Sequence, residues 1–268
     1  MKRQMKILAL VLSGLMIFAM LAGCGASHKD WEEIGPKGEM IIGVTPNAPM
    51  NYQDENGEYT LGFDTEFAEA VCAILEVKAK FVEIDWEAKE TELNSKNIDA
   101  IWNGMTITDE RAKSMDISVA YMTNRPVIVV RAADLDKYQS AGDFAGVALV
   151  AEAGSTLEEC VNEQAIFANA DYTPVDAQLK GLMEVLAGTA DMTVIDGTMA
   201  GEQTKEGSDF AALAIIDKNF PSEEYGIAFR KKSPDTLKKV NDAIKQLKDD
   251  GTLQALADKY GLGSLLIK

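Results

Sequence analysis

Short apolar runs alternate with amphipathic stretches along the chain from about residue 38 onward. The apolar runs are typical of buried strands, and we expect strands at 40–44, 80–84, 98–101, 125–130, 146–150, 192–195 and 224–229. Apolar residues at helical spacing predict helices at 65–75, 88–94, 177–186, 237–247 and 253–260, with one more after Ser155. This alternation is typical of an α/β fold with mostly parallel sheets.

Polar residues mark several of the expected helix starts and one turn. Thr65 is an N-cap candidate, and Ser155 and Glu158 have the spacing of a capping box. Asn56-Gly57 predicts the turn of a hairpin. These signals divide the chain into short strand and helix units.

The segment 97–111 combines a buried strand, a polar turn and the opening of a helix capped by Thr108. Arg111 falls in the first helical turn, where the helix dipole disfavours a cation. Its place is explained if the guanidinium, the Thr106 hydroxyl and free backbone amides all face one anion, for which a carboxylate is the natural candidate. The alternative is a surface arginine that pairs with Glu110.

The N-terminal segment has the pattern of an export signal. Basic residues precede an apolar run at 7–22, and Leu21-Ala22-Gly23-Cys24 follows the pattern of the bacterial lipobox. We therefore expect a lipoprotein signal peptide at 1–23, lipidation of Cys24 and an irregular tether at 24–37. A plain signal peptide or a short anchor helix is the alternative, and both also place the protein outside the cytoplasm.

Composition narrows the possible functions. The chain has 26 basic and 43 acidic side chains, a formal charge of −17, and a negative surface repels nucleic acid and anionic lipid. The single histidine, His28, leaves no Ser-His-Asp or Cys-His pair and no multi-histidine metal site. No glycine-rich phosphate loop is present. We expect no cofactor, no metal and no nucleic-acid partner.

Six segments, taken together, resemble one protein family in its own order. They closely resemble the bacterial extracellular solute-binding proteins of family 3, the polar-amino-acid receptors of ABC importers. The segments are LGFDTEFAEAV (61–71), IDWEAKETELNSKNIDAIWNGMTITDER (84–111), AGST (153–156), AGTADMTVID (187–196), EEYGIAFRK (223–231) and DGTLQALADKYG (250–261).

The resemblance implies a two-lobed, type II periplasmic-binding-protein-like fold whose chain crosses twice between the lobes. The expected lobes are 38–121 with 226–268, and 122–225, with crossings near Tyr121–Asn124 and Asp217–Tyr225. This division places Cys72 and Cys160 in different lobes, so we expect two free, largely buried thiols.

In such folds the ligand lies beyond the carboxyl ends of the strands. By resemblance, Arg111 with Thr106 and the amide of Thr156 would bind the carboxylate of an amino acid. Asp196, with the Gly104 carbonyl and Thr106, would bind its ammonium, and Trp86 would contact its side chain. The other candidate ligand-binding residues are Asn103, Ser155, Glu152 and Asn47.

Some of these assignments have structural alternatives. Asp196 is also placed to cap a helix that starts at Gly197, and a lone tryptophan such as Trp86 is often a core residue. Trp102 and Met50 are weaker candidates for the pocket wall, and we expect both to be packing residues.

One departure from the family concerns the segment Thr45–Met50, which is one residue shorter than its counterparts and lacks their Asp and aromatic residue. Side-chain specificity therefore cannot be transferred from relatives. If Glu152 faces the ligand, it repels a second carboxylate, whereas it and Asn47 can pair with a polar neutral or cationic side chain. We expect glutamine-like, cystine-like or basic L-amino acids; the alternative is a Glu152 that points into solvent.

The sequence thus predicts a monomeric, lipid-anchored, extracytoplasmic receptor that delivers a free L-amino acid to an ABC transporter permease. One alternative is a dehydratase-type enzyme on the same scaffold with Glu152 as general acid. Arg111 and Asp196, fitted to an α-amino acid, argue against it. The other alternative is an amino-acid sensor domain, which the end of the sequence at Lys268 without a signalling domain disfavours.

Overall fold

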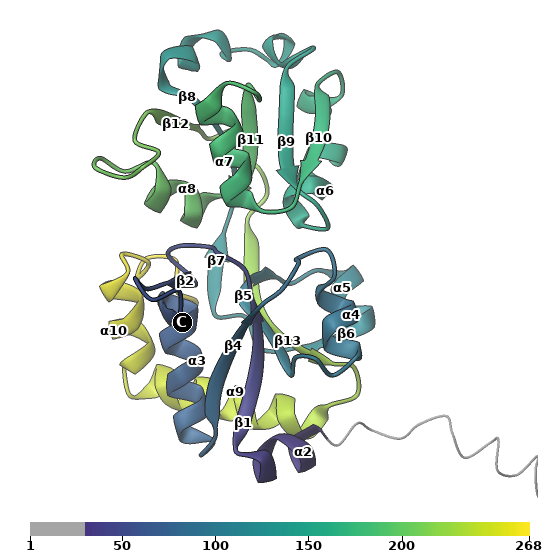
Figure 1. Cartoon of the computed structure of the whole chain (residues 1–268), viewed down its shortest axis with the longest axis vertical. Coiled ribbons are helices and arrows are strands. Elements are labelled where there is room, and N and C mark those ends of the chain that lie inside the picture. The colour runs from purple at the N-terminus through teal and green to yellow at the C-terminus, as the bar shows by residue number, and fades with distance from the viewer. Residues whose placement is uncertain (1–29) are drawn as a thin grey trace, which may run out of the picture.

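The computed structural model describes residues 30–268, so the expected signal peptide, Cys24 and His28 lie outside the described residues. Figure 1 shows two lobes stacked along the long axis of the molecule, each with its own sheet and helices. The predicted two-lobed α/β architecture is confirmed. No helix among residues 30–268 is long and apolar enough to span a membrane.

The first lobe, at the bottom of Figure 1, is built on a sheet with the strand order β4-β1-β5-β13-β6. Strand β1 runs parallel to β4 and β5, whereas β13 runs antiparallel to β5 and β6. The strands are β1 (Glu39–Val44), β4 (Lys78–Glu83), β5 (Ala100–Thr106), β6 (Met115–Ile117) and β13 (Glu223–Arg230). The predicted hairpin is also present, and it joins β2 (Tyr52–Gln53) to β3 (Tyr59–Leu61).

Among residues 30–268, six helices belong to this lobe. They are α2 (Asp30–Lys37), α3 (Phe63–Ile74), α4 (Lys89–Asn94), α5 (Asp109–Ser114), α9 (Pro234–Asp249) and α10 (Thr252–Lys259). Helices α3, α9 and α10 contribute Phe67, Ile244 and Leu253 to the main apolar core, together with Ile42 of β1. That core also buries Trp102 and Met50 completely, so the expectation that both are packing residues is confirmed.

The second lobe contains a sheet with the order β10-β9-β11-β8-β12. Its strands are β8 (Pro126–Arg131), β9 (Ala148–Glu152), β10 (Asp171–Val175), β11 (Met192–Asp196) and β12 (Leu213–Ile216). Its helices are α6 (Thr156–Glu163), α7 (Gln178–Ala187) and α8 (Gly197–Gln203), with short 3-10 turns at Ala132–Lys137, Ala141–Phe144 and Ala165–Phe167. Two apolar clusters pack on this sheet, one that includes Leu157 of α6 and one that includes Leu182 of α7.

Two strands connect the lobes. Strand β7 (Met122–Asn124) pairs antiparallel with residues 223–225 of β13, and Figure 1 shows both segments running between the lobes. Cys72 lies in α3 of the first lobe and Cys160 in α6 of the second, and both thiols are free and buried, as predicted.

In the main sheet of each lobe a single strand runs against all the others, β13 in the first lobe and β8 in the second, so the expected mostly parallel sheets are confirmed. Three expectations about local structure are wrong. Residues 102–106 continue β5 instead of turning. Helix α3 begins at Phe63, with Gly62 in the N-cap position, and the Thr65 hydroxyl instead accepts a hydrogen bond from Asn51.

The third concerns the expected tether at 24–37. Residues 30–37, expected to be irregular, form α2, which is fixed to the first lobe by contacts distant in sequence. The buried Asp30 carboxylate accepts hydrogen bonds from Arg230 Nε at 2.9 Å and Ser233 Oγ at 2.6 Å, and Ile34 joins the core. A buried, paired carboxylate can hold a short helix whose own sequence pattern is weak.

Candidate functional site

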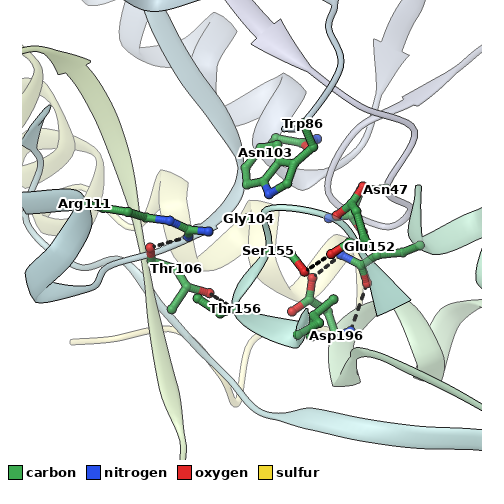
Figure 2. Close-up of a pocket in the computed structure, with 12 residues that line it drawn as sticks. Asn47, Trp86, Asn103, Gly104, Thr106, Arg111, Glu152, Ser155, Thr156 and Asp196 are labelled. Carbon is green, nitrogen blue, oxygen red and sulfur yellow. Dashed lines mark hydrogen bonds between the residues drawn. The ribbon is translucent and has the colours of Figure 1, made fainter. Parts of the chain in front are cut away.

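A pocket lies between the lobes, at the carboxyl ends of β5, β9 and β11. Figure 2 shows Arg111 and Thr156 on one side of it, and Asp196 and Glu152 on the other. All ten residues singled out from the sequence line this pocket, together with Gln178 and Leu157, which the sequence did not suggest. The ten are Asn47, Trp86, Asn103, Gly104, Thr106, Arg111, Glu152, Ser155, Thr156 and Asp196.

Arg111 is a buried cation. Its backbone N–H donates to Thr108 Oγ1 at 3.1 Å, which confirms the predicted N-cap, and its Nη1 donates to the Thr106 carbonyl at 2.8 Å. The side chain is only 6% exposed and forms no ion pair within residues 30–268. Glu110 pairs instead with Lys113 at 2.9 Å, so the surface-pair alternative for Arg111 is wrong.

Burial lowers the pKa of Arg111, and the carboxylates of Glu159 and Glu223 oppose that effect. An arginine retains its proton in proteins even so. The pocket therefore holds a desolvated positive charge with no partner carboxylate in the described part of the chain. Such a guanidinium favours an anion that can pair with it.

The N-terminus of α6 adds further donors beside Arg111. Ser155 caps this helix by accepting from the Glu158 amide at 3.2 Å, and its hydroxyl donates to the Glu152 carbonyl at 2.6 Å. The Glu158 carboxylate accepts from the Gly154 amide at 2.8 Å, so the reciprocal half of the predicted capping box is displaced by one residue. The first amides of a helix, here including Thr156, have no partner inside the helix and attract negative charge.

Asp196 ends β11 and is buried on the opposite side of the pocket. Asn124 Nδ2 and Gln178 Nε2 each donate to its carboxylate at 2.6 Å. Although Asp196 occupies the N-cap position of α8, its side chain makes no capping hydrogen bond, so capping does not explain it. Burial, followed by the charge of Glu223, raises its pKa to about 7. A cation placed beside it would favour the ionised form.

Gly104 brings the backbone of β5 close to the pocket in a left-handed conformation, with φ +58°. A Cβ there would lie 3.2 Å from the Tyr225 ring, a tight contact, and the left-handed conformation itself favours glycine. The Gly104 amide donates to Asp64 Oδ2 at 2.6 Å, and the Tyr121 hydroxyl donates to the same oxygen at 2.8 Å. Burial raises the pKa of Asp64 to about 7. Asp64 thus stabilises the left-handed conformation of Gly104 from behind the pocket wall.

The amide of Asn103 lines the pocket, but its polar atoms are used within the protein. Its Oδ1 accepts from the Thr45 hydroxyl at 2.6 Å, and its Nδ2 donates to the Thr45 carbonyl at 2.9 Å and to Asn51 Oδ1 at 2.8 Å. These bonds hold the segment 45–51. They place Asn47, which is 3% exposed, in the pocket wall.

Glu152 ends β9 and is only 4% exposed, so the solvent-facing alternative is wrong. Burial, with a smaller contribution from Asp196, raises its pKa to about 8, while Lys89 and Arg111 oppose the shift. At neutral pH the Glu152 side chain is therefore mainly a neutral carboxylic acid, which can both donate and accept a hydrogen bond.

Trp86 is both a core residue and a pocket residue, because it packs against Leu93 and Ile98 and also lines the pocket. Lys89, which the sequence did not suggest, lies over the indole ring at 5.0 Å. Its amine donates to the Trp86 carbonyl at 3.1 Å and, across the cleft, to the Gly154 carbonyl at 2.9 Å. Burial, followed by the charge of Arg111, lowers its pKa to about 8.

The arrangement has two charged poles in an enclosed space. A desolvated guanidinium and helix amides lie at one pole, and a hydrogen-bonded carboxylate lies at the other. A small solute that carries both an anion and a cation matches these poles. The fold and the site together define a two-lobed binding protein that encloses a small polar solute between its lobes.

The sequence family agrees with this class. Residues 40–263 match the family described as bacterial extracellular solute-binding proteins, family 3, and the chain belongs to that family. The chain is similar to the L-cystine-binding protein of Escherichia coli, with 30% identity over 254 residues that cover 93% of this chain and 94% of the relative.

Two solved structures are similar to the whole fold. One is an ABC uptake transporter substrate-binding protein from Streptococcus pneumoniae with bound histidine, with a TM-score of 0.82, 27% identity, and coverage of 90% of this chain and 99% of that one. The other is an ancestral amino-acid-binding protein described as a precursor of cyclohexadienyl dehydratase, with a TM-score of 0.79, 32% identity, and coverage of 86% and 99%.

Proposed function

We propose that this protein is an extracytoplasmic, lipid-anchored receptor that binds a free L-amino acid between its lobes and delivers it to an ABC transporter. The observation that carries the proposal is that Arg111 and Asp196, which have opposite charges, line opposite sides of one buried pocket. Arg111 is a buried cation without an ionic partner among residues 30–268, and Asp196 is a buried carboxylate held by two neutral amide donors.

In this proposal the ligand carboxylate binds Arg111 and the amides at the start of α6. The ligand ammonium binds Asp196, with the Gly104 carbonyl and the Thr106 hydroxyl nearby. The Thr106 hydroxyl already donates its hydrogen to Glu223 at 2.9 Å. Its oxygen can therefore accept a hydrogen bond from the ammonium. Each lobe therefore contributes one charged pole to the ligand.

The lobes are proposed to close on the ligand by a hinge motion at 121–124 and 217–225. Residues 38–121 and 226–268, extended by α2, would move as one body and 122–225 as the other. Contacts across the cleft support a closed arrangement in this structure, because Lys89 reaches Gly154 and the Thr106 and Thr156 hydroxyls lie 3.4 Å apart.

For the ligand side chain we propose a preference for polar neutral or basic groups over acidic ones. Asp196 already places one carboxylate in the pocket beside the buried acid Glu152, so a second ligand carboxylate would add a further negative charge there. The nearest cations, Arg111 and Lys89, are engaged by the ligand head group and by backbone carbonyls, respectively. Like charges in a partly dry cleft are strongly unfavourable.

A dehydratase-type enzyme is a second candidate, because Glu152 is a buried acid whose pKa of about 8 would suit a general acid. A substrate such as prephenate has no amine, however, and would leave Asp196 without a cation. Purified protein should therefore release no product from prephenate. Turnover that disappears in Glu152→Gln would favour the enzyme.

Native mass spectrometry of protein purified without refolding tests the proposed function. We expect a monomer that retains one molecule with the mass of an amino acid, and a thermal-shift screen in which free L-amino acids raise the melting temperature. The proposal fails if no amino acid, including L-cystine, stabilises a protein whose circular dichroism shows that it is folded.

A further inference from the structure

Two buried polar atoms in the pocket wall have no hydrogen-bond partner within residues 30–268. They are Asn47 Oδ1 and Trp86 Nε1, and their side chains are 3% and 5% exposed. Nearly all buried polar atoms in proteins are paired, and an unpaired one costs free energy. These two atoms belong to residues that line the same pocket, so a bound ligand can satisfy both.

The two atoms have opposite requirements. The indole N–H of Trp86 can only donate, and the amide oxygen of Asn47 can only accept. Between them the ligand must therefore present both an acceptor and a donor. Glu152, in the same wall, is a buried acid that forms no ion pair with any described residue and, when protonated, pairs with either kind of group.

We propose that Asn47, Trp86 and Glu152 form a distal subsite for a ligand side chain that ends in a group with both a hydrogen-bond donor and an acceptor. A carboxamide has this chemistry, and so does a second amino-acid head group at the far end of a disulfide-linked amino acid. The inference rests on the proposed function, which assigns the first head group to Arg111 and Asp196.

Other side chains fail on at least one of the three partners. A carboxylate can accept from Trp86 and from protonated Glu152, but it has no hydrogen to donate to the Asn47 oxygen, which can only accept. A guanidinium or ammonium can donate to Asn47 and Glu152, but it leaves the indole N–H unpaired. An aliphatic side chain leaves the Asn47 oxygen and the Trp86 N–H unpaired in a dry site.

Both residues are held in place before any ligand binds. The backbone N–H of Asn47 donates to the Asn51 carbonyl at 2.8 Å, and the backbone carbonyl of Asn47 accepts from the Met50 N–H at 2.7 Å. The Trp86 ring has the Lys89 amine 5.0 Å from its centroid and the Arg111 guanidinium at 5.9 Å. A rigid donor and a rigid acceptor discriminate between ligands better than mobile ones.

Calorimetry on the purified protein, after removal of retained ligand, tests the subsite with six probes: L-glutamine, L-asparagine, L-cystine, L-arginine, L-glutamate and L-leucine. We expect one of the first three to bind at least tenfold more tightly than each of the last three. If L-cystine is preferred, the distal group is a second head group; if L-glutamine or L-asparagine is preferred, it is a carboxamide.

Two variants test the donor and the acceptor, and the first of them distinguishes the Trp86 N–H from its aromatic ring. Trp86→Phe retains an aromatic ring and loses the N–H, so it should weaken the preferred probe about tenfold and change arginine binding by less than twofold. Asn47→Leu should weaken the preferred probe by a similar factor. Trp31→Phe and Asn97→Leu, at sites outside the pocket lining, are the matched controls and should leave all affinities unchanged.

The possible outcomes are distinct. Tightest binding of arginine, glutamate or leucine overturns the subsite but leaves an amino-acid receptor intact. Equal weakening of glutamine and arginine by Trp86→Phe also overturns it, because a ring contact alone would then explain Trp86. Failure of every amino acid to bind a folded protein contradicts the proposed function itself.

Discussion

The Lys89 amine of the first lobe donates a hydrogen bond to the Gly154 carbonyl of the second lobe at 2.9 Å. The same amine donates to the Trp86 carbonyl at 3.1 Å and lies over the Trp86 ring. One side chain therefore joins the wall of the pocket to the opposite lobe. Lys89 is buried and makes no ion pair with a described residue, so these carbonyls are its main compensation for desolvation.

Lys89→Met should accelerate ligand release, because the bond to Gly154 exists only when the lobes are closed. A hydrogen bond to a charged group contributes about 1.5–3 kcal/mol, part of which is offset by the desolvation of the amine. We expect the dissociation rate to rise about tenfold and the association rate to change little. Stopped-flow tryptophan fluorescence measures both rates, with the exposed Lys113→Met as control. An unchanged dissociation rate would show that this bond does not hold the lobes together.

The affinity for amino acids should depend on pH through two buried acids. Asp196, with a pKa of about 7, must be ionised to pair with the ligand ammonium, so every amino acid should bind more tightly as the pH rises to about 7. A cationic side chain also requires ionised Glu152, whose pKa is about 8. Lys89 and Arg111 also face Glu152, and they oppose the upward shift of its pKa.

The ratio of arginine to glutamine affinity should therefore increase between pH 7 and 8, by less than about tenfold per pH unit. Calorimetry of both ligands from pH 6 to 8 measures this ratio. In Glu152→Gln the ratio should become independent of pH. A ratio that is already constant in the unmodified protein would mean that Glu152 does not sense the ligand side chain.

Asp64 should make the protein less stable as the pH rises. Its pKa is about 7 in the folded protein and about 4 in an unfolded chain, so the folded state holds an extra proton between these values. The associated stability is present below about pH 4 and is lost progressively up to about pH 7.

Asp64→Asn removes this dependence. The free energy of unfolding of the variant, relative to the unmodified protein, should increase by up to about 1.4 kcal/mol per pH unit between pH 5 and 7. Urea unfolding at several pH values measures the difference, with the exposed Asp242→Asn as a control of small effect. Parallel curves for the two proteins would contradict the assignment of a raised pKa to Asp64.

The membrane attachment that we propose can be tested separately from the site. Cys24→Ala should move the protein out of the membrane fraction or leave its signal peptide uncleaved, because the lipid-bearing thiol is lost. Amino-acid binding by the released protein should not change. A processed Cys24→Ala protein that still sediments with membranes would refute the lipid anchor.

The location of the site was predictable because it follows from strand ends. Glu152 and Asp196 end two neighbouring parallel strands of the second lobe, and Thr106 ends a strand of the first lobe. In open α/β sheets ligands bind beyond the carboxyl ends of the strands. The resemblance to the family then assigned the lobes, which composition did not reveal. Together these signals brought ten candidate residues to the pocket that the structure shows.

The supporting residues were not predictable, because their partners are distant in sequence. Asn124 holds Asp196 across 72 positions, and Lys89 meets Gly154 across 65. Lys89 has the sequence signature of an exposed charge on a short helix, and nothing local shows that it is buried. In the same way α2 depends on Asp30 contacting Arg230, 200 positions away.

The one reversed strand of the first lobe's sheet, β13, has a related cause. The pattern of β13 indicates a buried strand, but pattern alone does not fix direction. Its direction follows from the return of the chain from the second lobe, which places β13 antiparallel to β5. Local sequence therefore predicted the element, and the path of the whole chain decided its pairing.

The most direct test of the account is the affinity of Arg111→Ala for the ligand that the unmodified protein binds best, measured by calorimetry. Removing one partner of a buried ion pair costs about 3–5 kcal/mol, a factor of hundreds or more in affinity. Arg111→Lys should not restore binding, because an ammonium lacks the planar fork that pairs with a carboxylate. Circular dichroism should show both variants folded. Near-normal affinity in a folded Arg111→Ala protein would contradict the assignment of this pocket as the amino-acid site.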